Sequence, residues 1–380
     1  MKNPLCSLAC FSVSNKKSLQ CSQLPEGLCC HFSLAEIKAA TNNFKADSVI
    51  GRDSYGNTYK GTTNDGTIVA VKRWQRKNGS YRASEFQNEL LFLCQLRNPH
   101  LVSLLGISED GNEMILVYEY TSRGAFSDHL YGEGYAPLHW KQRLQICIGA
   151  ARGLHYLHTG VKHAVFHCDI KTSNILIDEE CSSKLSGFGL SKLGPRSMSK
   201  ALIRKESRIT GTYGYMAPEY ALHGELTDRS DVYSFGVVLF EVLFGRRVYD
   251  AIQSWNLLEY AQESLREGTI YHAIDPHLKG RIAPQCLDKY LEIAISCVHR
   301  IGNERPAMGE VEVTLELALE LQGRADAEMQ ATNPCGECMY EQVLFSAFPR
   351  KFTGLDIPYD PFGFSDSDDN NSSQMLCHEG

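Results

Sequence analysis

One stretch, His167-Cys-Asp-Ile-Lys-Thr-Ser-Asn174, decides the fold of this chain. It follows residues 142–158, whose apolar side chains recur at spacings of three and four and predict a long helix that ends near His158. The stretch is therefore expected to form a loop directly after that helix. Its candidate functional side chains are an acid, a cation and an amide: Asp169, Lys171 and Asn174.

Four further motifs surround this loop. Upstream lie a glycine-bearing strand-turn-strand, Ile50-Gly-Arg-Asp-Ser-Tyr-Gly-Asn-Thr-Tyr-Lys-Gly61, and Val69-Ala-Val-Lys72 on the strand that follows it. Downstream lie Ser186-Gly-Phe-Gly189 and Ala217-Pro-Glu219. Each motif alone is a weak signal, but their order and spacing together are specific.

The predicted elements change character along the chain. Strands are expected at 49–51, 58–61, 67–74, 101–108 and 114–120, with helices at 33–41 and 84–96. Further helices are expected at 142–158, 230–244, 257–267, 287–299 and 308–321. A strand-rich first third before a helical remainder predicts an α+β protein in two lobes, a small β-rich N-lobe at about 44–120 and a large helical C-lobe at about 121–321.

This set of motifs resembles the protein kinase signature over residues 44–321. The lead-in at 32–44, with residues 113–120, 142–158 and 230–236, looks most similar to plant receptor-like kinases, in particular the FERONIA-like receptors and the Pto-like cytoplasmic kinases. The resemblance implies a role in intracellular signalling, with other protein kinases or receptor kinases as partners. We expect the cytoplasmic type, because the chain shows neither an ectodomain nor a run of about 18 apolar residues.

The resemblance also implies roles for individual residues. Asp169 corresponds to the base that orients the substrate hydroxyl, Lys171 to the cation that neutralises the transferring phosphoryl group, and Asn174 to a metal ligand. The Asp-x-Lys spacing resembles serine/threonine kinases rather than tyrosine kinases.

The ATP site can be placed in the same way. Lys72 corresponds to the lysine that reaches the α- and β-phosphates, and Glu89 to its ion-pair partner. The pattern supports this pair independently, because Glu89 lies in an apolar helix stripe where a carboxylate is costly unless a cation meets it. The other nucleotide-binding positions that the resemblance implies are Ile50, Gly51, Gly56, Thr58, Ala70, Glu119 and Leu176.

The most damaging departure from the family pattern is Gly187. It stands where the family has the aspartate that binds the phosphate-bridging Mg²⁺, and glycine offers no ligand. Losing a charge-stabilising element of this kind typically costs about 3–4 kcal/mol of transition-state stabilisation. A functional Mg²⁺ site is therefore doubtful.

Three more departures fall near the same chemistry. Asp53 replaces the second glycine of the phosphate-covering loop, adding a side chain and a like charge beside the phosphates. Thr58 replaces a valine that packs on adenine, and Cys168 replaces the arginine before the catalytic aspartate. Cys168 alone says little about activity, but Gly187 and Asp53 together predict that ATP binds weakly or not at all.

Several matching residues are expected to support the fold only. Glu219 and Arg305 resemble the buried pair that ties the activation segment, the residues between Gly187 and Glu219, to the last helices. Asp231 resembles the residue that props the catalytic-loop backbone, and His167 and Phe188 resemble core spine residues.

Composition limits the remaining possibilities. The chain has 38 Lys and Arg against 45 Asp and Glu, a net charge of −7, so no nucleic-acid partner is expected. Residues 323–380 hold 10 acidic and 3 basic residues, which gives that segment −7 by itself. We expect residues 1–31 to be a flexible arm, 32–321 the kinase domain and 322–380 an acidic, disordered tail.

The cysteines raise two weaker hypotheses. Cys6 and Cys10 are candidates for palmitoylation, which would hold an otherwise cytoplasmic protein at the inner face of the plasma membrane. Cys335 and Cys338 could form half of a zinc site, although no second pair has matching spacing apart from Cys377-His378.

Three functions therefore compete. The first is a pseudokinase that serves as a scaffold or allosteric partner, which Gly187, Asp53 and Thr58 favour. The second is an active, low-turnover, ATP-dependent serine/threonine kinase. It stays open because five matching residues are present together: Asp169, Lys171, Asn174, Lys72 and Glu89. The third is a non-catalytic nucleotide sensor.

Overall fold

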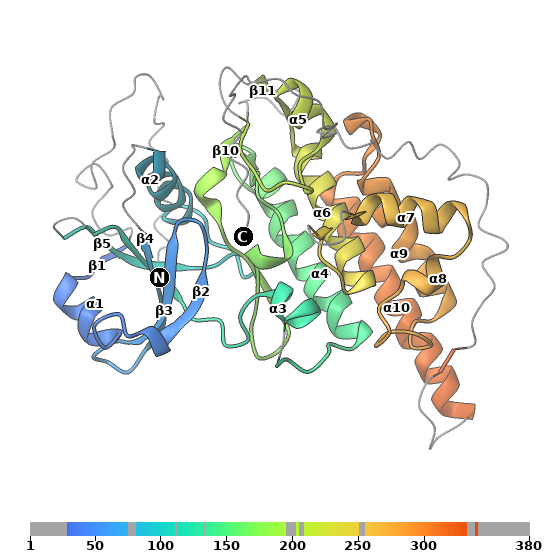
Figure 1. Ribbon diagram of the computed structural model, residues 1–380, viewed down its shortest axis with the longest axis horizontal. Coiled ribbons are helices and arrows are strands. Elements are labelled where there is room, and N and C mark those ends of the chain that lie inside the picture. Colours follow the sequence, from blue (N-terminus) through green and yellow to red (C-terminus); the bar gives the residue numbers. More distant parts are fainter. Residues whose placement is uncertain are drawn as a thin grey trace, which may run out of the picture.

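The computed structural model describes residues 29–74, 81–110, 113–132, 134–194, 203–204, 209–250, 255–332 and 339–340. The fold has two lobes, as the sequence predicts (Figure 1). A β-sheet with two helices forms the N-lobe, and helices dominate the C-lobe. Cys6, Cys10, Cys335, Cys338 and Cys377 lie outside the described residues.

The N-lobe is built on one six-stranded sheet in the order β1-β5-β6-β4-β3-β2. Its strands are β1 (Cys30–His31), β2 (Val49–Arg52), β3 (Gly56–Thr62), β4 (Ile68–Trp74), β5 (Leu104–Ser108) and β6 (Ile115–Glu119). All neighbours pair antiparallel except β1, which runs parallel to β5. The register places Lys72 of β4 between Thr58 of β3 and Leu116 of β6, near the middle of the sheet.

Two helices pack against this sheet. Helix α1 (Leu34–Ala40) starts at a capping box formed by Ser33 and Glu36, and it buries Ile37 in a cluster with strand residues such as Val69 and Val117. Helix α2 (Tyr81–Leu93) buries Phe86, Leu90 and Leu93, the apolar stripe seen in the sequence, in the larger core.

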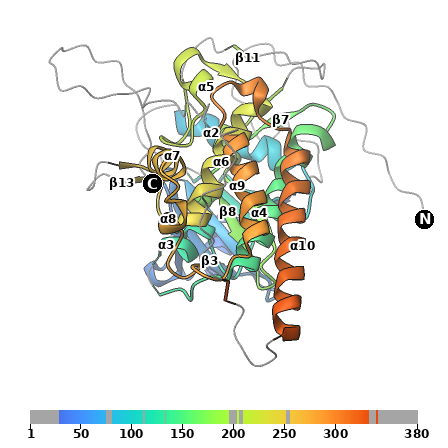
Figure 2. The same cartoon turned by 90° about the vertical axis from the view of Figure 1, so that its right-hand side faces the viewer.

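The C-lobe is a helical layer around one buried helix. Its helices are α3 (Phe126–Tyr131), α4 (Trp140–His155), α5 (Pro218–His223), α6 (Asp228–Phe244), α7 (Leu257–Arg266), α8 (Ile270–Ala273), α9 (Pro284–Cys297) and α10 (Met308–Thr332). Helix α6 is buried along almost its whole length, which explains why its sequence is apolar all round. Figure 2 shows α4, α6, α9 and α10 gathered in this lobe. Within the described ranges, no helix combines the length and apolar character that a membrane span requires.

Short antiparallel strand pairs lie among the loops of the C-lobe. They are β7 (Val165–Phe166) with β10 (Lys192–Leu193), β8 (Ile175–Ile177) with β9 (Ser183–Leu185), β11 (Ile203–Arg204) with β12 (Glu225–Leu226), and β13 (Tyr249–Asp250) with β14 (Trp255–Asn256). The β7–β10 and β8–β9 pairs bracket the loop that contains Asp169, Lys171 and Asn174.

Helix α10 differs from the expectation. It continues to Thr332, so the domain boundary expected at residue 321 lies inside the helix, and residues 322–332 are not part of a disordered tail. Gln322 is buried there. Its side-chain oxygen accepts from the backbone N–H of Ala283, and its Nε2 donates to the backbone oxygen of Arg281 and to Oδ1 of Asp326. These polar contacts extend the helix where the apolar pattern ends.

Candidate active site

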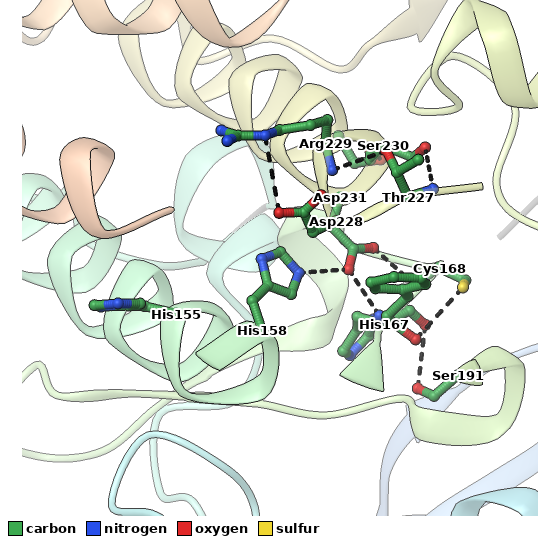
Figure 3. A network of polar contacts seen from close by, with 12 residues as sticks. His155, His158, His167, Cys168, Ser191, Thr227, Asp228, Arg229, Ser230 and Asp231 are labelled. Atoms are coloured by element: carbon green, nitrogen blue, oxygen red, sulfur yellow. Dashed lines mark hydrogen bonds and ion pairs between the residues drawn. The ribbon is translucent and has the colours of Figure 1, made fainter. Parts of the chain in front are cut away.

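The loop at residues 167–174 is held by Asp231 near the start of α6 (Figure 3). One carboxylate oxygen accepts from the backbone N–H of Cys168 at 2.9 Å, and the other accepts from the N–H of His167 at 2.8 Å and contacts Nε2 of His158 at 2.9 Å. Cys168 has a φ of +67°, a conformation that costs a non-glycine residue about 1–2 kcal/mol. The two backbone hydrogen bonds that Asp231 accepts stabilise this turn, the supporting role that the resemblance implies.

Asp169 and Lys171 meet on the upper side of the loop. The Lys171 Nζ lies 3.3 Å from Oδ2 of Asp169 and donates to the hydroxyl of Thr212 at 2.9 Å. The same hydroxyl donates to Oδ1 of Asp169 at 2.6 Å. Asp169, Lys171 and Thr212 therefore form a compact polar triangle.

Asn174 turns toward Asp169. Its Nδ2 donates to the backbone oxygen of Asp169 at 2.8 Å and to the Oδ2 of the same residue at 2.9 Å. The amide side chain occupies the space beside Gly187, whose φ is +81°: a Cβ at Gly187 would lie 2.7 Å from Nδ2 of Asn174. The residue expected to bind metal thus fills the volume that the missing aspartate would need.

The core spine is assembled as expected. Phe188 and His167 are fully buried, with their ring centroids 4.9 Å apart, and His167 Nε2 lies 3.0 Å from the carbonyl oxygen of Ser186. Burial lowers the pKa of His167, which favours the neutral imidazole. These residues hold the fold rather than contact a substrate.

Lys72 has two carboxylate partners. The expected pair is present, with 3.8 Å between Nζ of Lys72 and Oε2 of Glu89, but Oδ2 of Asp53 is closer at 2.9 Å. The hydroxyl of Tyr118 donates to the other oxygen of Glu89 at 2.7 Å. Burial acts to lower the pKa of the Lys72 ammonium, yet the charges of Glu89 and Asp53 raise it above its ordinary value.

The glycine-bearing loop turns inward at Asp53. Its Oδ1 accepts from the backbone N–H groups of Tyr55 and Gly56 at 2.8 and 2.9 Å. The ring of Tyr55 packs on Trp74 with centroids 4.8 Å apart, and the Lys72 Nζ lies 4.6 Å from the Trp74 ring centroid. A Cβ at Gly56 would lie 2.1 Å from the backbone oxygen of Arg73, so only glycine fits this close approach to β4.

The remaining predicted nucleotide positions lie on both lobes. Ala70 and Leu176 are partly buried against the main core, and Ile50 is 44% exposed. Gly51 pairs with Thr58 across β2 and β3. The side chain of Glu119 is engaged by other residues: it pairs with Lys184 at 3.0 Å and accepts from the N–H of Ser103.

The pair expected below the activation segment is also present. Arg305 donates to both carboxylate oxygens of Glu219 at 2.8 Å, a bidentate geometry, and the Arg305 side chain is fully buried. The backbone oxygens of His299 and Arg229 accept its other donors. This pair joins α5 to the segment before α10.

Sequence reasoning missed three contributors to the site. Tyr118 and Thr212 act through hydroxyl groups that carry no distinctive spacing. Asn88 of α2 donates from one amide to the carbonyl oxygens of Gly189 and Ser191 at 2.9 and 2.7 Å. Asn88 precedes Glu89 directly, and its polar side chain beside an apolar stripe was the one available signal.

The residues present fit a magnesium nucleotide poorly. The carboxylate of Asp53 already pairs with Lys72 and accepts the N–H groups of Tyr55 and Gly56, and Gly187 supplies no carboxylate. In the part of the chain that the structure describes, no three His, Cys, Asp or Glu side chains gather to hold a metal ion.

The two lobes, the glycine-bearing loop and the catalytic loop define a protein kinase domain. Residues 44–315 match the family described as protein tyrosine and serine/threonine kinase, and the chain belongs to that family. It is 45% identical to the receptor-like protein kinase FERONIA of Arabidopsis thaliana over 336 residues, 87% of this chain and 37% of the relative. Two receptor-like protein kinases of the same plant are each 46% identical to this chain. The match to ANXUR2 covers 82% of this chain and 36% of the relative, and the match to HERK 1 covers 85% and 39%.

The chain therefore spans less than two fifths of the length of these relatives. The predicted fold class and the predicted likeness to plant receptor-like kinases are confirmed. Kinases of this family generally use ATP and Mg²⁺.

Proposed function

We propose that this chain is a catalytically impaired member of the kinase family that acts as a scaffold or allosteric partner in signalling by receptor-like kinases. The observation that supports this most is the environment of Gly187. A metal-binding carboxylate is missing there, and Asn174 is hydrogen-bonded to Asp169 in the space beside it. Mg²⁺ sites in such enzymes rely on one or two carboxylates plus phosphate, so little redundancy remains.

The internal supports of the kinase fold are nevertheless complete. Asp231 anchors the catalytic loop, and the Glu219–Arg305 pair anchors the activation segment. A defined docking surface needs these supports as much as phosphoryl transfer does. The relatives of this chain are receptor-like protein kinases, so kinases of that type are the proposed partners, met at the cytoplasmic side of a membrane.

A low-turnover serine/threonine kinase is the second candidate. The triangle of Asp169, Lys171 and Thr212 favours it, because the acid and the cation are placed together as transfer to a hydroxyl requires. The two candidates differ in whether Asp169 is needed.

Complementation of a knockout separates them. We expect Asp169→Asn to restore function and Arg305→Ala to fail. The latter removes a fully buried guanidinium and its bidentate contact with the partly buried Glu219 carboxylate, at a cost of up to about 3–5 kcal/mol. Glu225→Gln, which changes a carboxylate of β12 just after α5 and outside this pair, is the matched control and should complement fully. If Asp169→Asn alone abolishes function while the protein accumulates normally, catalysis matters and the scaffold proposal is wrong.

A further inference from the structure

The carboxylate of Asp53 contacts the same kinds of groups that a nucleotide phosphate contacts in a kinase. One oxygen lies 2.9 Å from the Lys72 ammonium, and the other accepts two successive backbone N–H groups of the loop, at 2.8 and 2.9 Å. A glycine-rich loop and a strand lysine are the elements that cover and pair nucleotide phosphates. Converging backbone N–H groups form a site for an anion, and here the anion is part of the chain.

The internal contact is favourable for a carboxylate in its ionised form. The side chain of Asp53 is 43% exposed, and its partial desolvation would raise its pKa. The charge of Lys72, the hydrogen bond from its ammonium and the two loop N–H groups bring the pKa below its usual range. Asp53 is therefore charged at neutral pH and competes with any second anion for the same donors.

The surrounding charge acts in the same direction. The Lys72 ammonium pairs with Asp53 and Glu89, and the charge of Asp169, which itself pairs with Lys171, also raises the pKa of Lys72. A triphosphate entering this environment would add negative charge where the nearest cation is already paired. Gly187 supplies no carboxylate for a metal ion that could neutralise that charge.

The part of the site that would receive a base is different in character. Ala70 on β4 and Leu176 on β8 are apolar, partly buried and packed against the main core. An uncharged aromatic ring can pack against these two apolar side chains without a charged partner. The two halves of the site thus favour different ligands.

We propose that Asp53 is an internal substitute for a nucleotide phosphate, and that this site takes a nucleoside or a similar uncharged heteroaromatic ligand in preference to a nucleoside triphosphate. The inference deepens the proposed function and rests on it, since it specifies the ligand class of the same impaired site. In this role Asp53 is a specificity-determining residue.

Calorimetric titration of the full chain with adenosine and with ATP, both without Mg²⁺, tests the proposal. Omitting the metal separates the effect of Asp53 from that of Gly187. We expect adenosine to bind at least as tightly as ATP. In Asp53→Asn, which keeps the shape and one acceptor, ATP should bind at least about tenfold tighter, a gain of about 1.4 kcal/mol, while adenosine changes less than twofold. Asp47→Asn, which removes an exposed carboxylate of the same lobe 2.7 Å from Lys45, is the control and should change neither affinity.

Two results would overturn the proposal. One is a native chain that binds ATP tenfold more tightly than adenosine, or that binds no adenosine at millimolar concentration. The other is an Asp53→Asn protein that melts at the native temperature and shows an unchanged ratio of the two affinities. Neither depends on phosphoryl transfer. An active native chain would contradict the proposed function, whereas these titrations address ligand preference alone.

Discussion

The amide of Asn174 lies where a side chain at position 187 would begin, so it limits the substitutions that Gly187 can accept. A Cβ at position 187 would lie 2.7–2.9 Å from the amide atoms of Asn174. The atoms in contact are the end of a side chain, which can rotate away. Aspartate and asparagine also tolerate the left-handed backbone conformation better than other non-glycine residues. Restoring the acid is therefore sterically feasible if Asn174 leaves Asp169.

We predict that Gly187→Asp raises phosphoryl transfer and that adding Asp53→Gly raises it further. The acid restores a metal ligand and the glycine frees Lys72, and a recovered charge-stabilising element is worth about 3–4 kcal/mol, or a factor of a few hundred in rate. The measurement is Mg²⁺-dependent autophosphorylation with labelled ATP.

Gly187→Asn is the matched control for this repair, because it fills the same space without a charge and should give no gain. Asp169→Asn introduced into the repaired protein should remove the gain. If the native chain already autophosphorylates at a rate that Asp169→Asn abolishes, Gly187 is not the dominant lesion.

At the scale of the element, helix α6 carries two buried acids. Asp231 near its start accepts backbone N–H groups of the loop at residues 167–174, and Glu241 nearer its end accepts tyrosine hydroxyl groups. Burial raises the pKa of Glu241 to about 8, although hydrogen bonds from residues including Tyr215 and Tyr131 offset part of that rise. Glu241 thereby joins the core helix to the activation segment and to α3.

The raised pKa of Glu241 predicts a pH dependence of stability. Its usual pKa is 4.5, so between about pH 4.5 and 8 the folded state binds more protons at this site than the unfolded state. Stability should therefore fall as pH rises through that window, by at most about 1.4 kcal/mol per pH unit, and level off above it. Urea unfolding at several pH values measures the slope.

Glu241→Gln cannot ionise and should flatten this slope. Glu292→Gln, at an exposed position of α9 beside Lys289, should leave the slope as in the native chain. An equal slope in native protein and Glu241→Gln would show that Glu241 is not the group responsible.

At the scale of the whole molecule, the kinase domain includes more chain than the family match at 44–315 covers. Strand β1 pairs with the sheet edge at β5, and α1 contributes the buried Ile37 to the N-lobe cluster. At the other end α10 runs to Thr332, and Tyr340 donates from its hydroxyl to Asp326 at 2.7 Å. Both flanking segments are therefore structural parts of the domain.

We predict that Ile37→Ala destabilises the protein by about 2–5 kcal/mol, because it leaves a cavity between α1 and the sheet. Lys38→Ala, an exposed neighbour on the same helix, should change stability by less than about 0.5 kcal/mol. The free energy of unfolding in urea measures both. Equal, small effects would mean that the lead-in does not contribute to the fold.

Much of this architecture could be predicted from the sequence. Periodicity located most strands and helices to within a few residues. The resemblance to protein kinases implied the Lys72–Glu89 and Glu219–Arg305 pairs, and the apolar stripe around Glu89 supported the first of them. The hydrogen bonds from the N–H groups of Tyr55 and Gly56 to the Asp53 carboxylate are also local. Aspartate commonly accepts such bonds two and three residues along the chain, so the sequence alone could predict them. The sequence pattern predicts only repulsion of phosphate at Asp53.

Other features depend on packing between distant segments, which no local pattern encodes. The placement of Asn174 beside Gly187 and the hydroxyl contacts of Thr212 bring together residues separated by 13 or more positions. The extension of α10 depends on Gln322 reaching backbone groups at Arg281 and Ala283. Such contacts exist only once the whole fold is formed.

The amide of Asn88 has a consequence for kinetics. It binds the carbonyl oxygens of Gly189 and Ser191, so α2 and the turn after Phe188 are fastened at one point. An outward swing of α2 must break these bonds or pull the turn with it. The two segments should therefore open as one cooperative unit, with a shared opening rate, and a partner that contacts either one would slow the exchange of amide hydrogens in both.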